Sequence, residues 1–361
     1  MIIKRLDWYI IRKFMVTFFM SIMFLALIII IFDISEKIDD FVRKSVPLRE
    51  IVVDYYMNFI PYFINMYSPM FVFLTVIFFT SKMTQDSEVV AMLSSGISYH
   101  RIVRPYLISA AIIAALSLVM GMWILPRANA TRVEFEQKYN PYRKVKMGHD
   151  MHYKLEDDHF VFFESFSAYN NTAYNFTLED LHGDRLHSKL TAESAQYDTV
   201  TGVWHLRNYF IRDYDEGLQD HIRSGRKLDT VFSMTREDFF RNRYTIQQLN
   251  QKELNQLIDT QIMRGDASVN MSLIEKHNRF SLPLSAFILT IIGLSLCTKK
   301  KRGGMGWNLA ADTALGFSYI LFMQFSEMFV ITDTLPAQVA VWLPNALYAV
   351  IAVVIYIKAP K

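Results

Sequence analysis

The chain has 361 residues, of which 52% are hydrophobic and 14% aromatic, and only 20% are charged. An apolar excess gathered into long uncharged runs is typical of a membrane protein and argues against an ordinary cytosolic enzyme. The net charge of +3 is far from the clustered basic surface that nucleic-acid binding requires. The single cysteine, Cys297, excludes an intramolecular disulfide and is expected to be a buried packing residue.

Six apolar runs are long enough to cross about 30 Å of hydrocarbon as helices. The first is too long for the apolar part of a secretory signal and has no small-residue cleavage site after it, so we expect a retained anchor. Trp8 and Tyr9, in the basic segment before this run, predict a separate interfacial helix. The predicted spans are residues 14–32, 55–81, 105–126, 280–298, 305–330 and 335–357.

Basic residues near the ends of the spans predict their orientation. Thirteen Lys and Arg residues flank the spans on the side of the N-terminus, against four in the short loops of the other side. Both termini are therefore expected in the cytoplasm. The run Lys299-Lys300-Lys301-Arg302 is expected to belong to this topology signal and to contact anionic headgroups rather than a specific ligand.

The fifth span carries two acids, Asp312 near its start and Glu327 near its end. Both lie close enough to an interface for anchoring at headgroup level, which we favour over a buried polar role. A secondary transporter with its own ion-coupled site would need ionisable groups at mid-membrane and internal repeats. The sequence shows neither, so this class of protein is disfavoured.

Residues 127–278 predict a separate domain outside the membrane, between the third and fourth spans, and divide the chain into segments 1–126, 127–278 and 279–361. Bulky residues over 159–166, 175–181, 189–197 and 203–211 predict short strands in an all-β fold, a β-sandwich or jelly-roll. The aromatic residues of this domain predict its interior, either a plain core or an apolar groove that holds a lipid chain. They are Phe160, Phe162, Phe166, Phe176, Tyr197 and Trp204.

Two amphipathic segments accompany this domain. Thr245 and Gln248 form a capping-box pattern that predicts the start of a helix leading back to the bilayer. Residues 47–57 begin with a proline and predict a helix lying along the outer surface before the second span. The histidines show no metal-ligand spacing, and no nucleotide-binding or hydrolase motif occurs, so any energy for work must come from a partner.

The cytoplasmic loop between the second and third spans, residues 81–104, predicts a short helix. Asp86 or Ser87 can cap this helix, Glu88 complements the helix dipole in the first turn, and Gly96 ends it. A compact surface helix of this kind can dock in the groove of another protein, and a packed re-entry turn is the alternative. The predicted apolar face consists of Val89, Met92 and Leu93.

Short fragments in a fixed order along nearly the whole chain carry a resemblance to a known family. They are Leu6-Asp7-Trp8-Tyr9-Ile10, Ser87-Glu88-Val89-Val90-Ala91-Met92, Ser95-Gly96, Trp123-Ile124-Leu125-Pro126, Val203-Trp204-His205-Leu206, Pro283-Leu284-Ser285, Gly316-Phe317 and Leu343-Pro344. Together with six spans and an outer domain after the third, they resemble the LptF/LptG permease family of the lipopolysaccharide exporter, closer to LptG.

The resemblance implies a heterodimer of an LptF-type and an LptG-type chain in the inner membrane of a Gram-negative bacterium. Two copies of an LptB-type ATPase would bind the ATP and Mg²⁺, so this chain would need no cofactor. Lipopolysaccharide would enter through gates formed by spans one and five, and the β-jellyroll domains would pass it to an LptC-type protein. The helix between spans two and three would couple the ATPase to the membrane through Asp86, Glu88, Val89, Met92, Leu93 and Gly96.

The resemblance also suggests lipid-contacting residues. In some relatives span one ends with a basic residue that meets lipid phosphates; here that position is Asp33, with Lys37 one turn later. A membrane-anchored sensor or scaffold with a ligand-binding β domain is the rival interpretation, and it needs no docking helix over residues 87–96. Candidates for the lipid cavity and gate, each with plain helix packing as the alternative, are Phe18, Phe19, Phe24, Lys37, Phe317, Tyr319 and Phe322, and those for a groove in the outer domain are Phe160, Phe162, Phe176 and Trp204.

Overall fold

The computed structural model describes residues 4–139, 148–155, 159–167, 170–182, 185–214, 220–232, 243–266, 268–298 and 305–359. By contacts the chain divides into two compact units. Met1–Arg132 and Leu273–Lys361 form a helical unit, and Val133–Ser272 form a β unit. Lys299–Arg302, predicted to contact headgroups, lie outside the described residues.

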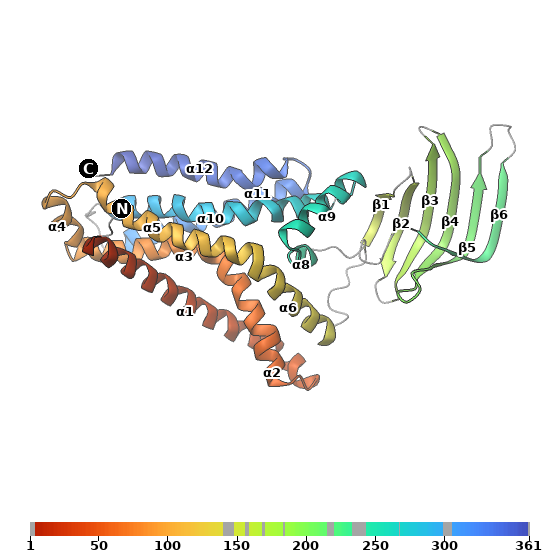
Figure 1. Cartoon of the computed structure of the whole chain (residues 1–361), viewed down its shortest axis with the longest axis horizontal. Coiled ribbons are helices and arrows are strands. Elements are labelled where there is room, and N and C mark those ends of the chain that lie inside the picture. Colours follow the sequence, from red (N-terminus) through yellow and green to blue (C-terminus); the bar gives the residue numbers. More distant parts are fainter. Residues whose placement is uncertain are drawn as a thin grey trace. The chain divides into compact units, whose positions relative to one another are not determined.

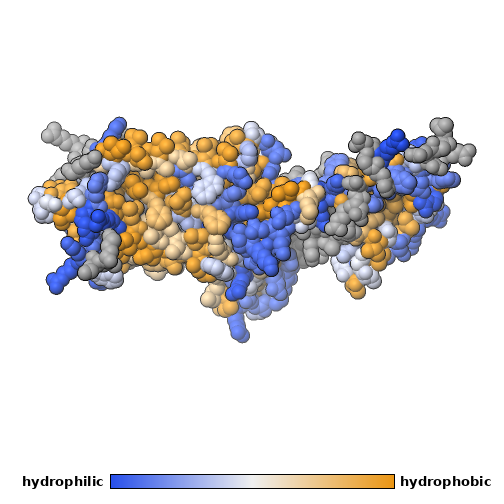
Figure 2. Space-filling model, turned by 45° about the horizontal axis from the view of Figure 1, so that its top comes forward, coloured by the Kyte–Doolittle hydropathy of each residue, from blue (hydrophilic) through white to orange (hydrophobic). Residues whose placement is uncertain are grey.

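Six helices of the described chain are long and apolar enough to cross a membrane, which confirms the predicted number of spans. In Figure 1 they run side by side through the helical unit, and Figure 2 shows a broad hydrophobic surface over them. They are α1 (Arg5–Arg43), α3 (Met57–Gln85) preceded by α2 (Leu48–Glu50) and η1 (Ile51–Tyr56), α5 (Tyr99–Val119) followed by η2 (Met120–Ile124) and α6 (Leu125–Tyr139), α10 (Val269–Cys297), α11 (Met305–Ile331) and α12 (Ala337–Lys358).

Two segments predicted as separate interfacial helices are instead continuous with spans, and the predictions were wrong in this respect. Trp8 and Tyr9 lie in the second turn of α1, which has no break before Arg43. Residues 48–56 form α2 and the π-helical η1, which continue directly into α3. The reason is tertiary packing: Asp7 and Ile10 are buried on α1, and Tyr55 and Tyr56 are buried on η1, so each segment packs against the bundle.

Helix α3 lies at the centre of the helical unit. Its Phe73 and Ile77 are fully buried in a cluster with Ile292 of α10, Tyr319 of α11 and Tyr348 of α12. Cys297 is buried in the same cluster, as predicted. Gly316 marks the closest approach to Phe73. A Cβ atom at Gly316 would lie 2.4 Å from Cδ1 of Phe73, so only glycine allows α11 to approach α3 this closely.

The β unit confirms the predicted all-β class between the third and fourth spans. Its strands form one antiparallel sheet in which each strand pairs with the next along the chain (Figure 1). Within the described residues the sheet contains β1 (Gly148–Lys154), β2 (His159–Ser167), β3 (Thr172–His182), β4 (Arg185–Tyr197), β5 (Trp204–Asp213) and β6 (His221–Thr230). Short helices α8 (Arg243–Ile246) and α9 (Gln251–Met263) follow the sheet.

At one row of paired residues across this sheet, the side chains along each strand change the face to which they point. Asn175 on β3 and Asn208 on β5 both adopt a left-handed φ angle of 51°, a region that Asn tolerates better than most residues. Their side-chain amides donate hydrogen bonds to Glu164 and Glu193 on the neighbouring strands. At this row the buried positions change from odd-numbered to even-numbered residues on β2, for example from Phe163 to Phe166. The reversal keeps apolar side chains on one face, and it explains why the sequence does not alternate strictly.

The turn between β4 and β5 and the start of α9 show how polar side chains fix local structure. At the turn, the Thr201 hydroxyl and the Val200 N–H donate to Asp198, and these bonds lower the pKa of its carboxyl below the usual range. At α9 the predicted cap at Thr245 was wrong, because the helix begins at Gln251. There Asn250 accepts from the N–H groups of the first turn, and the Glu253 carboxylate accepts from the N–H of Asn250.

The Gly316 contact gives a first prediction. Gly316→Ala places a methyl group against a fully buried ring that has no room to move, so we expect it to destabilise the helical unit by about 1 to 3 kcal/mol. Ala314→Val is the matched control, because Ala314 is exposed on the same helix. Thermal unfolding in detergent should show a lower midpoint for Gly316→Ala and little change for Ala314→Val. Equal midpoints for the two variants would contradict this account of the α3 and α11 contact.

Candidate functional site

The loop predicted to be cytoplasmic contains a short helix, α4 (Glu88–Ser94), between α3 and α5. Figure 1 places α4 at the same end of the helical unit as both chain termini. Two residues with left-handed φ angles bound it, Ser87 at 60° and Gly96 at 84°. Ser87 occupies the N-cap position but its side chain makes no capping bond, so the predicted capping by Asp86 or Ser87 side chains was wrong. Gly96 ends the helix turn, as predicted.

Glu88 connects α4 to the first turns of α1. Its carboxylate accepts a hydrogen bond of 2.9 Å from the Tyr9 hydroxyl and bonds of 3.2 and 3.3 Å from Nζ of Lys13. Nζ of Lys13 also lies 4.5 Å from the centre of the Tyr9 ring. The three side chains form one cluster in which a cation is held by a carboxylate and an aromatic face. The position of α4 is therefore linked to the position of α1.

A second ion pair connects α1 to α5 at the same end. Nη1 and Nη2 of Arg101 donate to the two carboxylate oxygens of Asp7 at 2.5 and 2.6 Å. Asp7 is only 4% exposed and also accepts from the N–H of Lys4 at 2.9 Å. A two-pronged pair between a guanidinium and a buried carboxylate fixes both distance and orientation. The start of α1 is therefore joined to α4 and to α5 by charged groups.

The predicted apolar face of α4 packs in part against this chain. Val89 is 2% exposed and belongs to the core cluster of α1, α3 and α5, and Met92 and Leu93 pack against the same cluster. Val89 therefore belongs to the core of this chain, whereas Met92 and Leu93 keep part of their surface exposed. The side of α4 that faces outward carries instead Asp86, Val90, Ala91, Ser94, Ser95 and Gly96. Asp86 and Gly96 remain candidates, and Glu88 is half-buried toward α1.

The fully buried side chains of α1 lie in its first half. In the described residues of α1, the last buried side chain is Ile22. Beyond it many apolar side chains are exposed, including Phe24 at 67% and Phe32 at 73%. Of the predicted gate residues, Phe19 and Phe24 are exposed, whereas Phe18 is buried in the core. The sequence predicted a lipid-facing helix without indicating which of its aromatic residues pack inward.

The far end of α1 is held by a polar cluster around Asp33. Nζ of Lys37 donates to Asp33 at 2.6 Å and contacts the Tyr55 hydroxyl. The hydroxyls of Tyr55 and Tyr56 donate to the two oxygens of the same carboxylate at 3.1 and 3.0 Å. Lys37 also lies over the rings of Tyr55 and Phe59. The cluster links α1 to η1 and α3, and it pairs the charge of Lys37 within the chain.

On α11 the three predicted residues differ in exposure. Phe317 is 50% exposed, Phe322 is partly buried against the core, and Tyr319 is fully buried with its hydroxyl bonded to Asn345 of α12 at 2.8 Å. Tyr319 therefore holds helices together rather than lining a lipid path. The anchoring prediction for Glu327 was wrong, because Glu327 is 4% exposed and accepts from Asn278 of α10 at 2.8 Å. The side chain of Asp312 lies outside the described residues.

The four aromatic residues predicted to form a groove in the β unit lie on two faces of the sheet. Phe176 and Trp204 are buried in the apolar cluster on one face, with ring centres 6.3 Å apart. Phe160 and Phe162 point to the other face, because they alternate with the buried Val161 and Phe163. They line a separate pocket on that face. The sequence could not show this division, because the aromatic residues of β2 occur on both faces.

Comparison with protein families agrees with this layout. The model of a family described as the lipopolysaccharide export system permease LptF/LptG matches residues 8–358. The chain belongs to the LptF/LptG family. A comparison with curated individual proteins finds no match. The match covers all six spans and the β unit, so the permease has the fold class that the sequence predicted.

Sequence reasoning missed the partners of Asp7 and Asp33 in this permease. Asp7 was noted only as part of the fragment Leu6-Asp7-Trp8-Tyr9-Ile10. Asp33 was noted only because some relatives have a basic residue at that position. For Asp33 the available signal was its place at the end of the uncharged run 14–32, where a charge needs a nearby partner. Arg101 is 94 residues away from Asp7 in the sequence, so no local pattern could identify it.

The ion pairs give a second prediction, tested by a double-mutant cycle. Arg101→Ala leaves the Asp7 carboxylate buried without its guanidinium, so this variant should unfold at a clearly lower temperature than Asp7→Ala/Arg101→Ala. The half-exposed pair of Lys13 and Glu88 is the matched control in the same unit, and its coupling should be small. Thermal unfolding of each set of single and double variants measures both couplings. A coupling for Asp7 and Arg101 no larger than that of the control would contradict a structural role.

Proposed function

We propose that this chain is a permease subunit through which a separate ATPase drives the extraction of lipopolysaccharide from the inner membrane. Both termini and α4 would face the cytoplasm, and the β unit would lie in the periplasm. The partners would be a paralogous LptF- or LptG-type chain, an LptB-type ATPase dimer that binds the ATP and Mg²⁺, and an LptC-type protein that receives the lipopolysaccharide. Family membership supports this assignment, and so does the geometry of α4.

The observation that carries the proposal is the double attachment of α4. One side of this helix packs on α1, α3 and α5 through Val89, while the other side is exposed. Glu88 joins it to Tyr9 and Lys13 of α1 by direct hydrogen bonds. An ATPase bound to the exposed side would therefore displace α1 together with α4. A helix that served only as a connecting turn would not need polar bonds to a different span.

The length of α1 makes such a displacement reach across the membrane. Its 39 residues extend about 58 Å at 1.5 Å per residue, nearly twice the thickness of the hydrocarbon core. The inner half is packed and the outer half exposes its apolar side chains. A movement at the inner end would change the position of the exposed half, where a lipid or a partner helix can lie against Phe24 and Phe32.

The energetics favour an apolar surface at this place. Removing acyl chains from a bilayer costs about 0.8 kcal/mol per CH₂ group unless the chains enter another apolar enclosure. The exposed phenylalanines of α1 and Phe317 of α11 would form part of that enclosure in the assembled transporter. The permease itself would make or break no covalent bond, since the ATPase supplies the energy.

The third prediction tests the exposed side of α4. Ser94→Trp adds a bulky side chain to that side without touching the core, so the ATPase should no longer co-purify with the permease and extraction from vesicles should stop. Ser224→Trp is the control, because Ser224 is an exposed serine on β6, and it should retain both. Thermal unfolding should be unchanged for both variants.

Each other outcome decides against the proposal. If no ATPase co-purifies with the unmodified chain and its paralogue, the rival function of a membrane-anchored sensor or scaffold gains support. If Ser94→Trp retains full extraction, force does not enter through the exposed side of α4. A Glu88→Gln variant separates the two steps, because it should keep the ATPase bound while lowering extraction, and normal extraction by this variant would contradict transmission through α1.

A further inference from the structure

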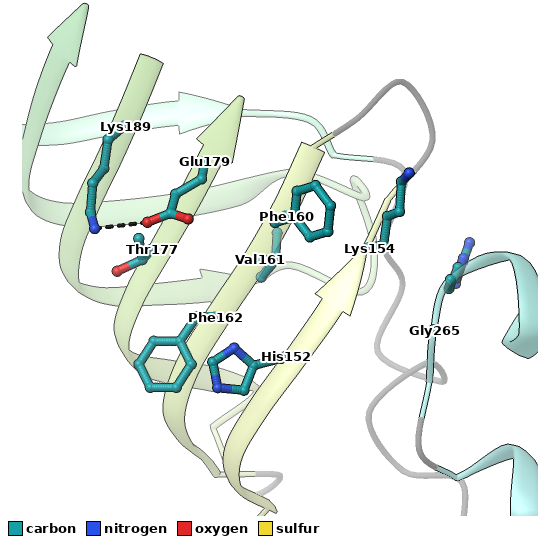
Figure 3. A pocket seen from close by; sticks show the side chains of 10 residues that line it. His152, Lys154, Phe160, Val161, Phe162, Thr177, Glu179, Lys189 and Gly265 are labelled. Atoms are coloured by element: carbon teal, nitrogen blue, oxygen red, sulfur yellow. Dashed lines mark hydrogen bonds and ion pairs between the residues drawn. The ribbon is translucent and has the colours of Figure 1, made fainter. Parts of the chain in front are cut away.

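The β unit contains a pocket on the face of the sheet opposite its apolar core (Figure 3). The pocket has a volume of about 570 Å³, within the range of small-molecule sites. Every strand from β1 to β4 contributes to it, together with the turn that follows α9. Its lining is His152, Lys154, Phe160, Val161, Phe162, Thr177, Glu179, Lys189, Arg264 and Gly265.

Strand register places these side chains in two adjacent rows. Residues paired across antiparallel strands point to the same face. One row therefore continues from Lys154 through Phe160 and Glu179 to Lys189. The other continues from His152 through Phe162 to Thr177. The core face is separate, because Val161, Leu178 and Leu190 pair in the register between these rows.

Arg264 reaches the pocket because a helix ends beside the edge strand. Gly265, with φ of +62°, follows the end of α9, and its N–H donates to the carbonyl of Ile262. The carbonyl of Arg264 then accepts a 3.1 Å bond from the N–H of Lys154. This bond attaches the turn to β1. The guanidinium of Arg264 and the ammonium of Lys154 thus belong to the lining of one pocket.

The chemistry of the lining has three parts. The first is basic. The lining residues include Lys154, Lys189 and Arg264 and one carboxylate, that of Glu179. The second is a pair of aromatic rings: Phe160 is 38% exposed and lies near Nζ of Lys154, and the ring of Phe162 lies 4.5 Å from that of His152. The third is a set of hydrogen-bonding groups suited to hydroxyls, namely the carboxylate of Glu179 and the hydroxyl of Thr177.

We propose that this pocket binds a sugar that carries a phosphate or carboxylate group. Lys154 and Arg264 would hold the anion, since a guanidinium and an ammonium are the groups that bind phosphate and carboxylate. The faces of Phe160 and Phe162 would pack on the C–H groups of the sugar ring, as flat apolar surfaces. Glu179, held by Lys189 at 2.8 Å, would accept bonds from sugar hydroxyls. The choice of a sugar rests on the proposed function, because lipopolysaccharide is a glycolipid with anionic sugars.

A simple titration is the fourth prediction and needs neither transport nor the ATPase. The full chain in nanodiscs carries 4-fluorophenylalanine at position 162, or at position 210 as a control, since Phe210 lies on the same face outside the pocket lining. We expect glucose 6-phosphate to shift the ¹⁹F signal at 162 saturably in the millimolar range and to leave the signal at 210 unchanged. Glucose and inorganic phosphate, titrated separately, should each bind about tenfold more weakly, a difference of about 1.4 kcal/mol.

Two variants test the residues. Lys154→Ala/Arg264→Ala should weaken glucose 6-phosphate binding at least about tenfold. Arg212→Ala should leave it unchanged, because Arg212 continues the same row beyond Lys189 and lies outside the pocket lining. The unshifted ¹⁹F signal of each variant before titration shows that the sheet is intact.

The outcomes are distinct from those for the proposed function. Absence of a saturable shift at 162, or a shift that the double variant does not alter, would overturn the pocket even if the Ser94→Trp experiment succeeds. Inorganic phosphate that binds as tightly as the sugar phosphate would also overturn the proposal, because the pocket would then recognise an anion alone. Conversely, saturable sugar phosphate binding would support the pocket even if no ATPase couples to α4.

Discussion

The pairing of charges at the two ends of α1 is the interaction on which the helical unit depends. Asp7 and Asp33 are 26 positions apart, about 39 Å along a helix, so they lie beyond the two limits of a hydrocarbon core about 30 Å thick. An ionised carboxylate at such a place is costly unless a cation or hydroxyl meets it. Arg101 of α5 donates hydrogen bonds to Asp7. Lys37 of α1 and the hydroxyls of Tyr55 and Tyr56 of η1 donate to Asp33. These partners hold α1 to its neighbours at the positions of Asp7 and Asp33.

The sequence predicted the six spans because an uncharged run of about twenty residues has few other stable structures. It could not predict which side of each span packs inward. On a helix that is apolar all round, hydrophobic periodicity does not distinguish a core residue from a lipid-facing one. Phe18 and Phe19 are neighbours of the same type, yet Phe18 is buried and Phe19 is half exposed. The same limit applies to α4. Its sequence did not show that Val89 completes the core of its own chain.

The strands illustrate a different limit. A strict alternation of apolar and polar residues identifies the buried face of a strand. A shift of this alternation by one residue moves the following side chains to the opposite face. Here Asn175 and Asn208 produce that change through left-handed backbone angles within strands. An asparagine in a strand is a weak sequence signal. The predicted groove combined Phe160 and Phe162 from one face with Phe176 and Trp204 from the other, because the aromatic residues of β2 occur on both faces. The strand positions themselves were predictable, because bulky residues and intervening turns mark them clearly.

In the proposed mechanism, the uneven packing of α1 would meet two requirements of a permease. A helix buried along its whole length is held by van der Waals contacts that a partner cannot exchange for its own. A helix exposed along its whole length would receive no displacement from α4. The observed arrangement combines the two, because the residues up to Ile22 are packed and bonded to α4 and α5, while the outer residues keep apolar surface available for lipid or a partner helix. The cluster at Asp33 would then limit a movement of the outer half, since Tyr55 and Tyr56 connect it to η1. A π-helical segment is rare and occurs often at functional sites, so in the proposed mechanism η1 would accommodate a displacement of α1 without breaking α3.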